Sequence, residues 1–275
     1  MRTEQLPAGI GPEIVYSHYE RRQLSGEQCV AEHGLTYLLA GSLRVTDAGA
    51  SQTFEAGSLL FSRKNFLAKF TKQPAEDGPF RAITVVFGRA MLLEYRQPHS
   101  VRSEPPAPAM AAVMPLAINA SLNEFFEALQ PYFEVPLPAP LARDQQQEAL
   151  RRLLLAQPVL QTVLFDFGQP GKIDLEAFMR QHFRFNVELK QLAYLTGRSL
   201  ATFKRDFDKV FHNSPARWLY QQRLAEAHYL LQEESRRPSD VYHEVGFESL
   251  AHFSHAFKQF FGCSPSRIRT APASH

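Results

Sequence analysis

The pattern of hydrophobic and polar positions divides the chain into two parts. Over roughly the first hundred residues, short runs rich in β-branched and aromatic residues recur between turn signals. They predict strands at residues 14–19, 28–31, 35–39, 43–46, 57–61, 67–72 and 80–87. Residues 42–46 alternate polar and apolar positions as a half-buried strand does, and residues 47–50 predict a hairpin. Short strands at this spacing favour a small antiparallel barrel or sandwich.

A proline-rich connector follows the predicted strands. Residues 98–115 contain five prolines, so we expect neither a regular helix nor a central strand there. Ser121 and Glu124 then form the pattern of a capping box, which predicts a helix start. The apolar face of this helix consists of Leu122, Phe125, Phe126 and Leu129.

A second helix is predicted over residues 143–155, after a break of three prolines. Its leucine stripe, Leu150, Leu153 and Leu154, has two interpretations. The leucines pack in the core of the protomer, or they contact a second subunit. Residues 166–172, with two glycines and a proline, predict a linker.

The C-terminal part contains an internal repeat. Phe203, Phe207, Phe211 and the pair Ser214-Pro215 recur 50 residues later as Phe253, Phe257, Phe261 and Ser264-Pro265. Gly197 recurs as Gly246 at an offset of 49, so the two copies differ by one residue in a turn. Each copy has a short helix, predicted at 189–195 and 240–245, a glycine-containing turn and a longer helix. This order predicts two helix-turn-helix units, joined by a helix at 215–232 that starts with proline.

The longer helix of each unit predicts a DNA-contacting face. Its phenylalanines share one face, which leaves the residues between them exposed. These are Leu200, Ala201, Thr202, Lys204 and Arg205 in the first copy, and Ala251, His252, Ser254, His255 and Lys258 in the second. Arg205 is the first candidate for a base contact, because arginine suits the O6 and N7 acceptors of guanine. The other interpretation of Lys204 and Arg205 is an ordinary solvated face.

These residues carry a resemblance to a known family. The matching positions are Ser214-Pro215, Trp218-Leu219, Arg223-Leu224, Ala227, Val245-Gly246-Phe247, Phe253, Phe257-Lys258, Phe261-Gly262 and Ser264-Pro265. Over about a hundred residues the chain resembles the DNA-binding domain of the AraC/XylS family of transcription regulators. The resemblance implies a sequence-specific regulator, in our interpretation an activator, with double-stranded DNA as its partner.

The N-terminal part resembles the cupin-like regulatory domain of the same family. Tyr37-Leu38-Leu39, Gly41-Ser42-Leu43 with Val45, and residues 57–61 are similar to the subgroup of type III secretion master activators, as are residues 260–267. In that subgroup the barrel and its two helices are implied to serve self-association and binding of a regulatory protein. We therefore expect a homodimer formed through this domain, and a regulatory protein or small-molecule effector as a further partner.

Two positions depart from the family pattern. His212-Asn213 replaces the glycine that ends the first longer helix in a left-handed turn, which histidine or asparagine adopts only at some cost. Tyr242 replaces a small residue that allows close helix packing. We therefore expect the first helix of the second unit to lie further from its neighbours, and the second unit to contact DNA less closely.

Charge and composition add to this interpretation. The formal net charge is only +2, but from Lys172 onward there are 15 Lys and Arg against 11 Asp and Glu, and before it 15 against 17. The positive excess thus lies in the predicted DNA-binding part. The start of the chain lacks the pattern of a signal peptide, and we expect a cytoplasmic protein without a membrane segment.

Other classes of function fit the sequence less well. A cupin barrel with a metal needs several nearby histidines, whereas Glu32-His33 has no second neighbouring histidine and His18 lies on another strand. A metal site of His243, His252 and His255 lacks an evident further ligand, and Cys29 has no adjacent cation that would activate a thiol. We therefore expect no catalysis, no metal and no cofactor. A metal-binding enzyme of cupin fold and a small-molecule sensor remain the alternatives.

Together these patterns predict an α+β chain of two domains. Residues 1–165 form a cupin-like β-barrel with a helical hairpin, and residues 166–172 are a linker. Residues 173–275 form an all-α domain of two helix-turn-helix units joined by a linker helix.

Overall fold

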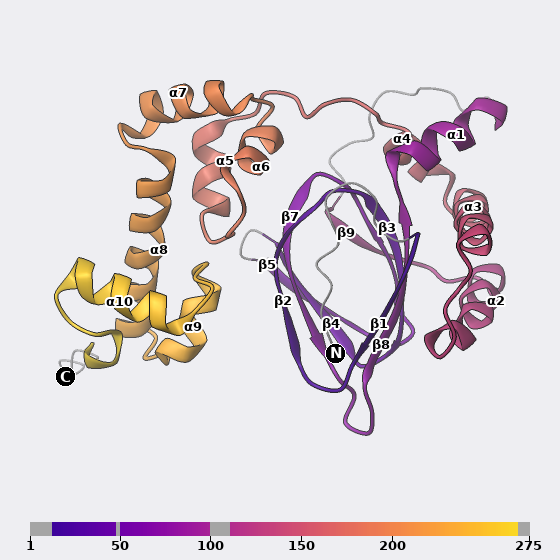
Figure 1. Cartoon of the computed structure of the whole chain (residues 1–275), viewed down its shortest axis with the longest axis horizontal. Helices are drawn as coiled ribbons and strands as arrows, with labels where there is room; N and C mark the ends of the chain where they lie inside the picture. The colour runs from indigo at the N-terminus through magenta and orange to yellow at the C-terminus, as the bar shows by residue number, and fades with distance from the viewer. Residues whose placement is uncertain (1–12, 48–49, 100–110, 269–275) are drawn as a thin grey trace. The chain divides into compact units, whose positions relative to one another are not determined.

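The computed structural model describes residues 13–47, 50–99 and 111–268 of the chain. The chain divides into two compact units, the first made mainly of residues up to Gly168 and the second mainly of residues from Gln169 onward. The first consists of β-sheets with flanking helices and the second is helical (Figure 1). In the part of the chain that is described, no helix has the length and apolar character needed to cross a membrane. The expected α+β fold is confirmed.

Two sheets form the first unit. One has the order β1 (Ile14–Tyr19), β8 (Phe80–Phe87), β3 (His33–Ala40), β6 (Leu59–Ser62) and β9 (Val113–Leu116), with each neighbouring pair antiparallel. The other has the order β2 (Gln23–Val30), β7 (Phe66–Gln73), β4 (Ser42–Asp47) and β5 (Ala50–Glu55). Apolar side chains from both sheets share one interior, among them Leu38, Val45, Phe54, Ala68 and Phe80. The sheets therefore enclose a common core, as the barrel prediction requires (Figure 1).

The structure corrects the strand prediction at β5. The expected hairpin is present, with Asp47 paired to Ala50, but its second strand is β5 and not residues 57–61. Strand β5 lies at a sheet edge, and Phe54 is its one buried side chain. An edge strand with a single buried residue has too little apolar alternation to be detected in the sequence.

The connector also differs from its prediction. Helix α1 (Arg89–His99) extends one residue past Pro98, and β9 contains Pro115. Residues 100–110 of the connector lie outside the described residues. Strand β9 forms the edge of its sheet. Proline lacks a backbone N–H, and an edge position accommodates it because one side of the strand needs no partner.

Helices pack against the first sheet. They are α2 (Ala120–Leu129), η1 (Gln130–Phe133), α3 (Ala139–Ala156), η2 (Pro158–Leu160) and α4 (Gln161–Leu164). The prediction of a capping box at Ser121 and Glu124 is wrong, because α2 begins at Ala120 and Ser121 therefore lies inside the helix. The side chain of Asn119 is its N-cap and accepts a bond from the Leu122 amide at 2.9 Å. Helix α3 starts four residues earlier than predicted, since Pro140 lies in the first turn, where no intrahelical N–H bond is lost.

The leucine stripe of α3 lies mainly in the core. Leu150 and Leu153 are completely buried with Phe126 of α2, Phe61 of β6 and Val85 of β8. Leu154 is partly buried against the same cluster. Core packing is therefore confirmed for these leucines, and they offer little surface to a second subunit.

His33 is a buried histidine at the start of β3. Its side chain is 1% exposed and stacks on the Phe61 ring with centroids 5.7 Å apart. Its Nδ1 accepts a hydrogen bond from the Lys64 amide at 3.2 Å, whereas Nε2 is buried without a partner among the described residues. The pKa of His33 is lowered to about 3, mainly by burial and in addition by the charges of Lys64 and Arg63. The imidazole is therefore neutral and supports the local backbone.

The expected linker is anchored at its two ends. In the first unit, the Phe167 ring lies under the Arg89 guanidinium at 5.1 Å, and the Phe167 carbonyl accepts a bond from Arg89 at 2.9 Å. In the second unit, Lys172 forms an ion pair with Asp206 at 3.2 Å. The part of the linker that lies between these two anchors is therefore shorter than the seven-residue linker predicted from its glycines and proline.

The second unit is made of helices that succeed one another along the chain. They are α5 (Leu175–His182), α6 (Leu189–Leu195), α7 (Leu200–Phe211), α8 (Pro215–Gln232), α9 (Pro238–Glu244), α10 (Leu250–Phe261) and the short η3 (Pro265–Arg267). The bounds predicted for α6 and α8 are confirmed. Helix α9 starts two residues before its prediction, with Pro238 at the start, a position that suits proline.

Candidate nucleic-acid interface

The repeat forms two helix-turn-helix units with the same turn. After α6, the Arg198 amide donates to the Ala193 carbonyl at 2.9 Å, and after α9 the Phe247 amide donates to the Tyr242 carbonyl at 2.9 Å. Gly197 and Gly246 adopt left-handed φ angles of 68° and 92°. A Cβ on Gly246 would meet the Arg184 carbonyl oxygen at 2.6 Å, so a side chain there is both strained and blocked.

Serine side chains cap both longer helices. Ser199 Oγ accepts a bond from the Thr202 amide at 3.2 Å, and Ser249 Oγ accepts one from the His252 amide at 3.2 Å. The caps are 50 residues apart and the turn glycines 49 apart. The extra residue thus lies in the second turn, as the sequence predicts. The caps themselves were missed, although serine before a helix is a recognisable N-cap signal.

The phenylalanine repeat holds each longer helix on its unit. Phe203, Phe207, Phe253 and Phe257 are completely buried, and Phe211 and Phe261 are half-buried. Helix α7 ends at His212 with φ 49°, and α10 ends at Gly262 with φ 77°. His212 therefore adopts the left-handed conformation that glycine has in the second copy, as predicted.

The opposite faces of α7 and α10 are accessible. The exposed residues among those predicted to contact DNA are Leu200, Ala201, Lys204, Arg205, Ala251, His252, His255 and Lys258, and the half-buried ones are Thr202 and Ser254. The structure thus places five of the ten on each of two helices, and four of the five on each helix occupy equivalent positions of the repeat. Because the phenylalanines fix both helices from behind, these side chains lie on faces that a DNA groove can approach.

Different contacts stabilise the two helix-turn-helix units behind these faces. In the first, the Asp206 carboxylate contacts Arg198 at 3.1 Å and Lys172 at 3.2 Å, and Arg205 approaches it at 3.8 Å. Hydrogen bonds from Arg198 and Lys172 lower the pKa of Asp206. In the second, the equivalent positions hold Phe247 and Ala256, both buried. An ionic contact in the first unit thus corresponds to an apolar contact in the second.

Arg223 of α8 connects the two units. Its guanidinium donates to the carbonyls of Phe183 at 2.9 Å and Phe185 at 2.7 Å, which precede α6, and to that of Gly246 at 3.1 Å in the second turn. It also donates to Asn186 Oδ1 at 3.3 Å. One side chain therefore holds both units on the helix that joins them. The sequence identified Arg223 only as a matching family position.

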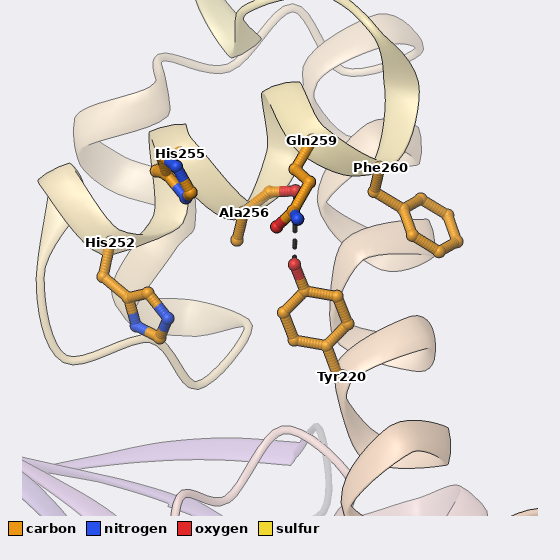
Figure 2. A pocket seen from close by; sticks show the side chains of 6 residues that line it. All are labelled: Tyr220, His252, His255, Ala256, Gln259 and Phe260. Atoms are coloured by element: carbon orange, nitrogen blue, oxygen red, sulfur yellow. Dashed lines mark hydrogen bonds between the residues drawn. The ribbon is translucent and has the colours of Figure 1, made fainter.

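A hollow adjoins the exposed face of α10. Its volume is about 470 Å³, and its lining residues are Tyr220, His252, His255, Ala256, Gln259 and Phe260. Figure 2 shows the Tyr220 ring from α8 on one side and the α10 side chains on the other. Tyr220, Gln259 and Phe260 were not predicted as site residues, because Tyr220 belongs to α8 and Lys258 was the one position predicted beyond Phe257.

Tyr242 does not disturb the second turn. Its side chain is half-buried against the core of that unit, and the hydrogen bond to its carbonyl has the same length as in the first unit. The predicted weaker DNA contact of the second unit remains a prediction.

Comparisons with known proteins agree with this arrangement. A family model described as a helix-turn-helix domain matches residues 192–271, and one described as the ExsA N-terminal regulatory domain matches residues 33–160. The HTH-type transcriptional regulator ExsA of Pseudomonas aeruginosa is 28% identical over 248 residues, covering 86% of this chain and 86% of the relative. The thermoregulatory protein LcrF of Yersinia pestis and the virulence regulon transcriptional activator VirF of Yersinia enterocolitica are each 26% identical over 253 residues, covering 87% of this chain and 91% of each relative.

The fold and its two exposed helix faces define a DNA-binding transcription regulator of the helix-turn-helix class. The chain carries a helix-turn-helix domain of the AraC type, and its N-terminal domain is similar to the regulatory domain of ExsA.

Proposed function

We propose that the protein binds a specific DNA site through α7 and α10, which contact two neighbouring segments of the major groove, and that it activates transcription there. The observation that supports this is the pair of equivalent exposed faces, both held on α8 through Arg223. The ten residues on these faces are the proposed contacts. The name of the relative VirF as an activator supports activation over repression. The proposal assigns residues 173–275 to DNA binding, 166–172 to the linker and 1–165 to regulation.

A genomic footprint tests this function. We expect the full chain, and a fragment of residues 169–275, to protect the same sites, because all ten proposed contacts lie in the fragment. Affinity should fall steeply with salt, since Lys and Arg release counterions from the phosphates they neutralise. A folded fragment and a folded full chain that protect no genomic site would show that the proposed function is wrong.

Within this function, Arg205 is the residue proposed to contact a guanine. Arg205→Ala should cost about 1–3 kcal/mol at the cognate site and relax the preference at one or two base pairs, as loss of a bidentate base contact does. His255→Ala, at the equivalent position of α10, should cost less. Lys209→Ala is the matched control, because Lys209 is an exposed cation in the last turn of the same helix. A uniform loss on all sequences would instead make Arg205 a phosphate contact.

The N-terminal domain is proposed to associate with a second copy or with a regulatory protein. Because Leu150 and Leu153 are buried, the surface for this contact would include Leu155 and Val159, which are 70% and 56% exposed. Pairing two chains raises affinity at adjacent sites through effective concentration. Leu155→Ser with Val159→Ser should therefore weaken binding at a double site more than at a single one. A chain that sediments as a monomer and binds double and single sites equally would contradict self-association. A rise in thermal stability with a cell metabolite would support an effector.

A further inference from the structure

The second recognition helix lacks the side chains that best recognise guanine. The first two turns of α10 contain Leu250, Ala251, His252, Phe253, Ser254, His255, Ala256 and Phe257. The first cation after them is Lys258, whereas α7 has Lys204 and Arg205 in its first two turns. Bidentate guanine contacts depend on arginine or lysine. The two units therefore differ in which base they can recognise.

The hollow beside α10 offers aromatic, imidazole and amide side chains in place of the arginine and lysine that contact guanine. His252, His255 and Gln259 follow one another at helical spacing on its α10 side, and the first two belong to the proposed DNA-contacting face. Behind them lie Ala256, which is 2% exposed, and the Phe260 ring, which is 46% exposed. The lining holds no Asp, Glu, Lys or Arg, so a phosphate finds no permanent positive charge there.

Tyr220 fixes the far wall of this hollow. Its hydroxyl donates to the Ala256 carbonyl at 3.3 Å, and its ring lies edge-on to Phe260 with centroids 6.4 Å apart (Figure 2). The result is an apolar wall next to one amide side chain. Apolar contacts recognise the C5 methyl group of thymine, and glutamine pairs with N6 and N7 of adenine.

We propose that this hollow receives the methyl group of a thymine, and that Tyr220, Gln259 and Phe260 determine the specificity of the second unit for an A·T pair. The first unit cannot do the same, because its positions equivalent to Ala256, Gln259 and Phe260 are Asp206, Lys209 and Val210. The inference rests on the proposed function, since it assigns a base to one of the two DNA-contacting faces.

The test removes the methyl group from the DNA. Each thymine of the footprinted site is replaced in turn by deoxyuridine, which keeps the base pairing. At one position or more, the full chain should bind about four-fold more weakly, the factor that corresponds to about 0.8 kcal/mol for one buried methylene-sized group. With Phe260→Ala the same replacement should change affinity less than about two-fold, because the methyl has lost its apolar contact. Val210→Ala, the matched change in α7, should keep the four-fold effect.

The outcomes separate this inference from the proposed function. A protein that protects a site but shows no thymine whose methyl effect depends on Phe260 overturns the inference and leaves DNA binding intact. A protein without any footprint contradicts the proposed DNA-binding function itself. Should Phe260→Ala unfold, Gln259→Ala replaces it, because Gln259 is exposed. This variant should lose about ten-fold of the preference for A·T over G·C at one base pair, and an unchanged preference counts against the inference.

Discussion

Replacing Arg223 by alanine is expected to lower the free energy of unfolding of the DNA-binding unit by about 3 kcal/mol. The change removes four hydrogen bonds from a charged donor, each worth about 1.5–3 kcal/mol but not additive. It also leaves the carbonyls of Phe183, Phe185 and Gly246 without this donor. Because these carbonyls belong to both units, the loss should reduce binding at the whole site and not at one half of it. Urea unfolding and affinity at the footprinted site measure the two effects.

Two variants control this prediction. Arg217→Ala changes an exposed arginine of the same helix and should alter stability by less than about 0.5 kcal/mol. Arg223→Lys keeps the charge, but one ammonium group cannot reproduce the planar fork of the guanidinium, so it should recover less than half of the loss. Full stability of Arg223→Lys would mean that charge, and not the bridging geometry, matters at this position.

The free energy of unfolding of the N-terminal domain is expected to fall by about 2 kcal/mol between pH 7 and pH 5 through His33 alone. The pKa of His33 is lowered to about 3 in the fold, because burial disfavours the imidazolium, whereas in the unfolded chain it returns to about 6.5. The unfolded state therefore binds the proton first as pH falls. The contribution of the neutral His33 to the free energy of unfolding is complete above about pH 6.5. It is lost toward pH 3, at about 1.4 kcal/mol per pH unit.

The measurement that tests the prediction for His33 is the slope of the free energy of unfolding against pH. His33→Asn keeps an acceptor for the Lys64 amide but has no imidazole to protonate, so its slope between pH 7 and pH 5 should be shallower than that of the wild type. His18→Asn, the same change at an exposed histidine of β1, is the matched control for a general effect of the substitution. Equal slopes for His33→Asn and the wild type would contradict a buried neutral imidazole.

The sequence predicted the elements whose residues repeat or alternate strongly. The 50-residue repeat of phenylalanines identified α7 and α10, and Pro215 marked the start of α8. In contrast, β5 has a single buried side chain and β9 contains a proline. Such edge strands are specified by their neighbours in the sheet, which are distant in the sequence, and so they escape a local pattern.

The sequence predicted part of the candidate site on α10 and none of the wall that α8 contributes. Residues between the phenylalanines of one helix share its exposed face, so His252 and His255 could be proposed from spacing alone. Tyr220 approaches them from α8, 32 residues before His252, and only the packing of α8 on α10 brings them together. For the same reason the contact of Arg198 with Asp206 was not foreseen.

The ionic contact in one helix-turn-helix unit and the apolar contact in the other give the duplicated halves different responses to salt. Burial of Phe247 and Ala256 is driven by the hydrophobic effect, which weakens on cooling. The ion pairs of Asp206 with Arg198 and Lys172 respond in addition to salt, because dissolved ions screen the exposed Lys172. Added salt should therefore weaken the contact behind the first recognition helix and leave the contact of Phe247 and Ala256 behind the second unchanged.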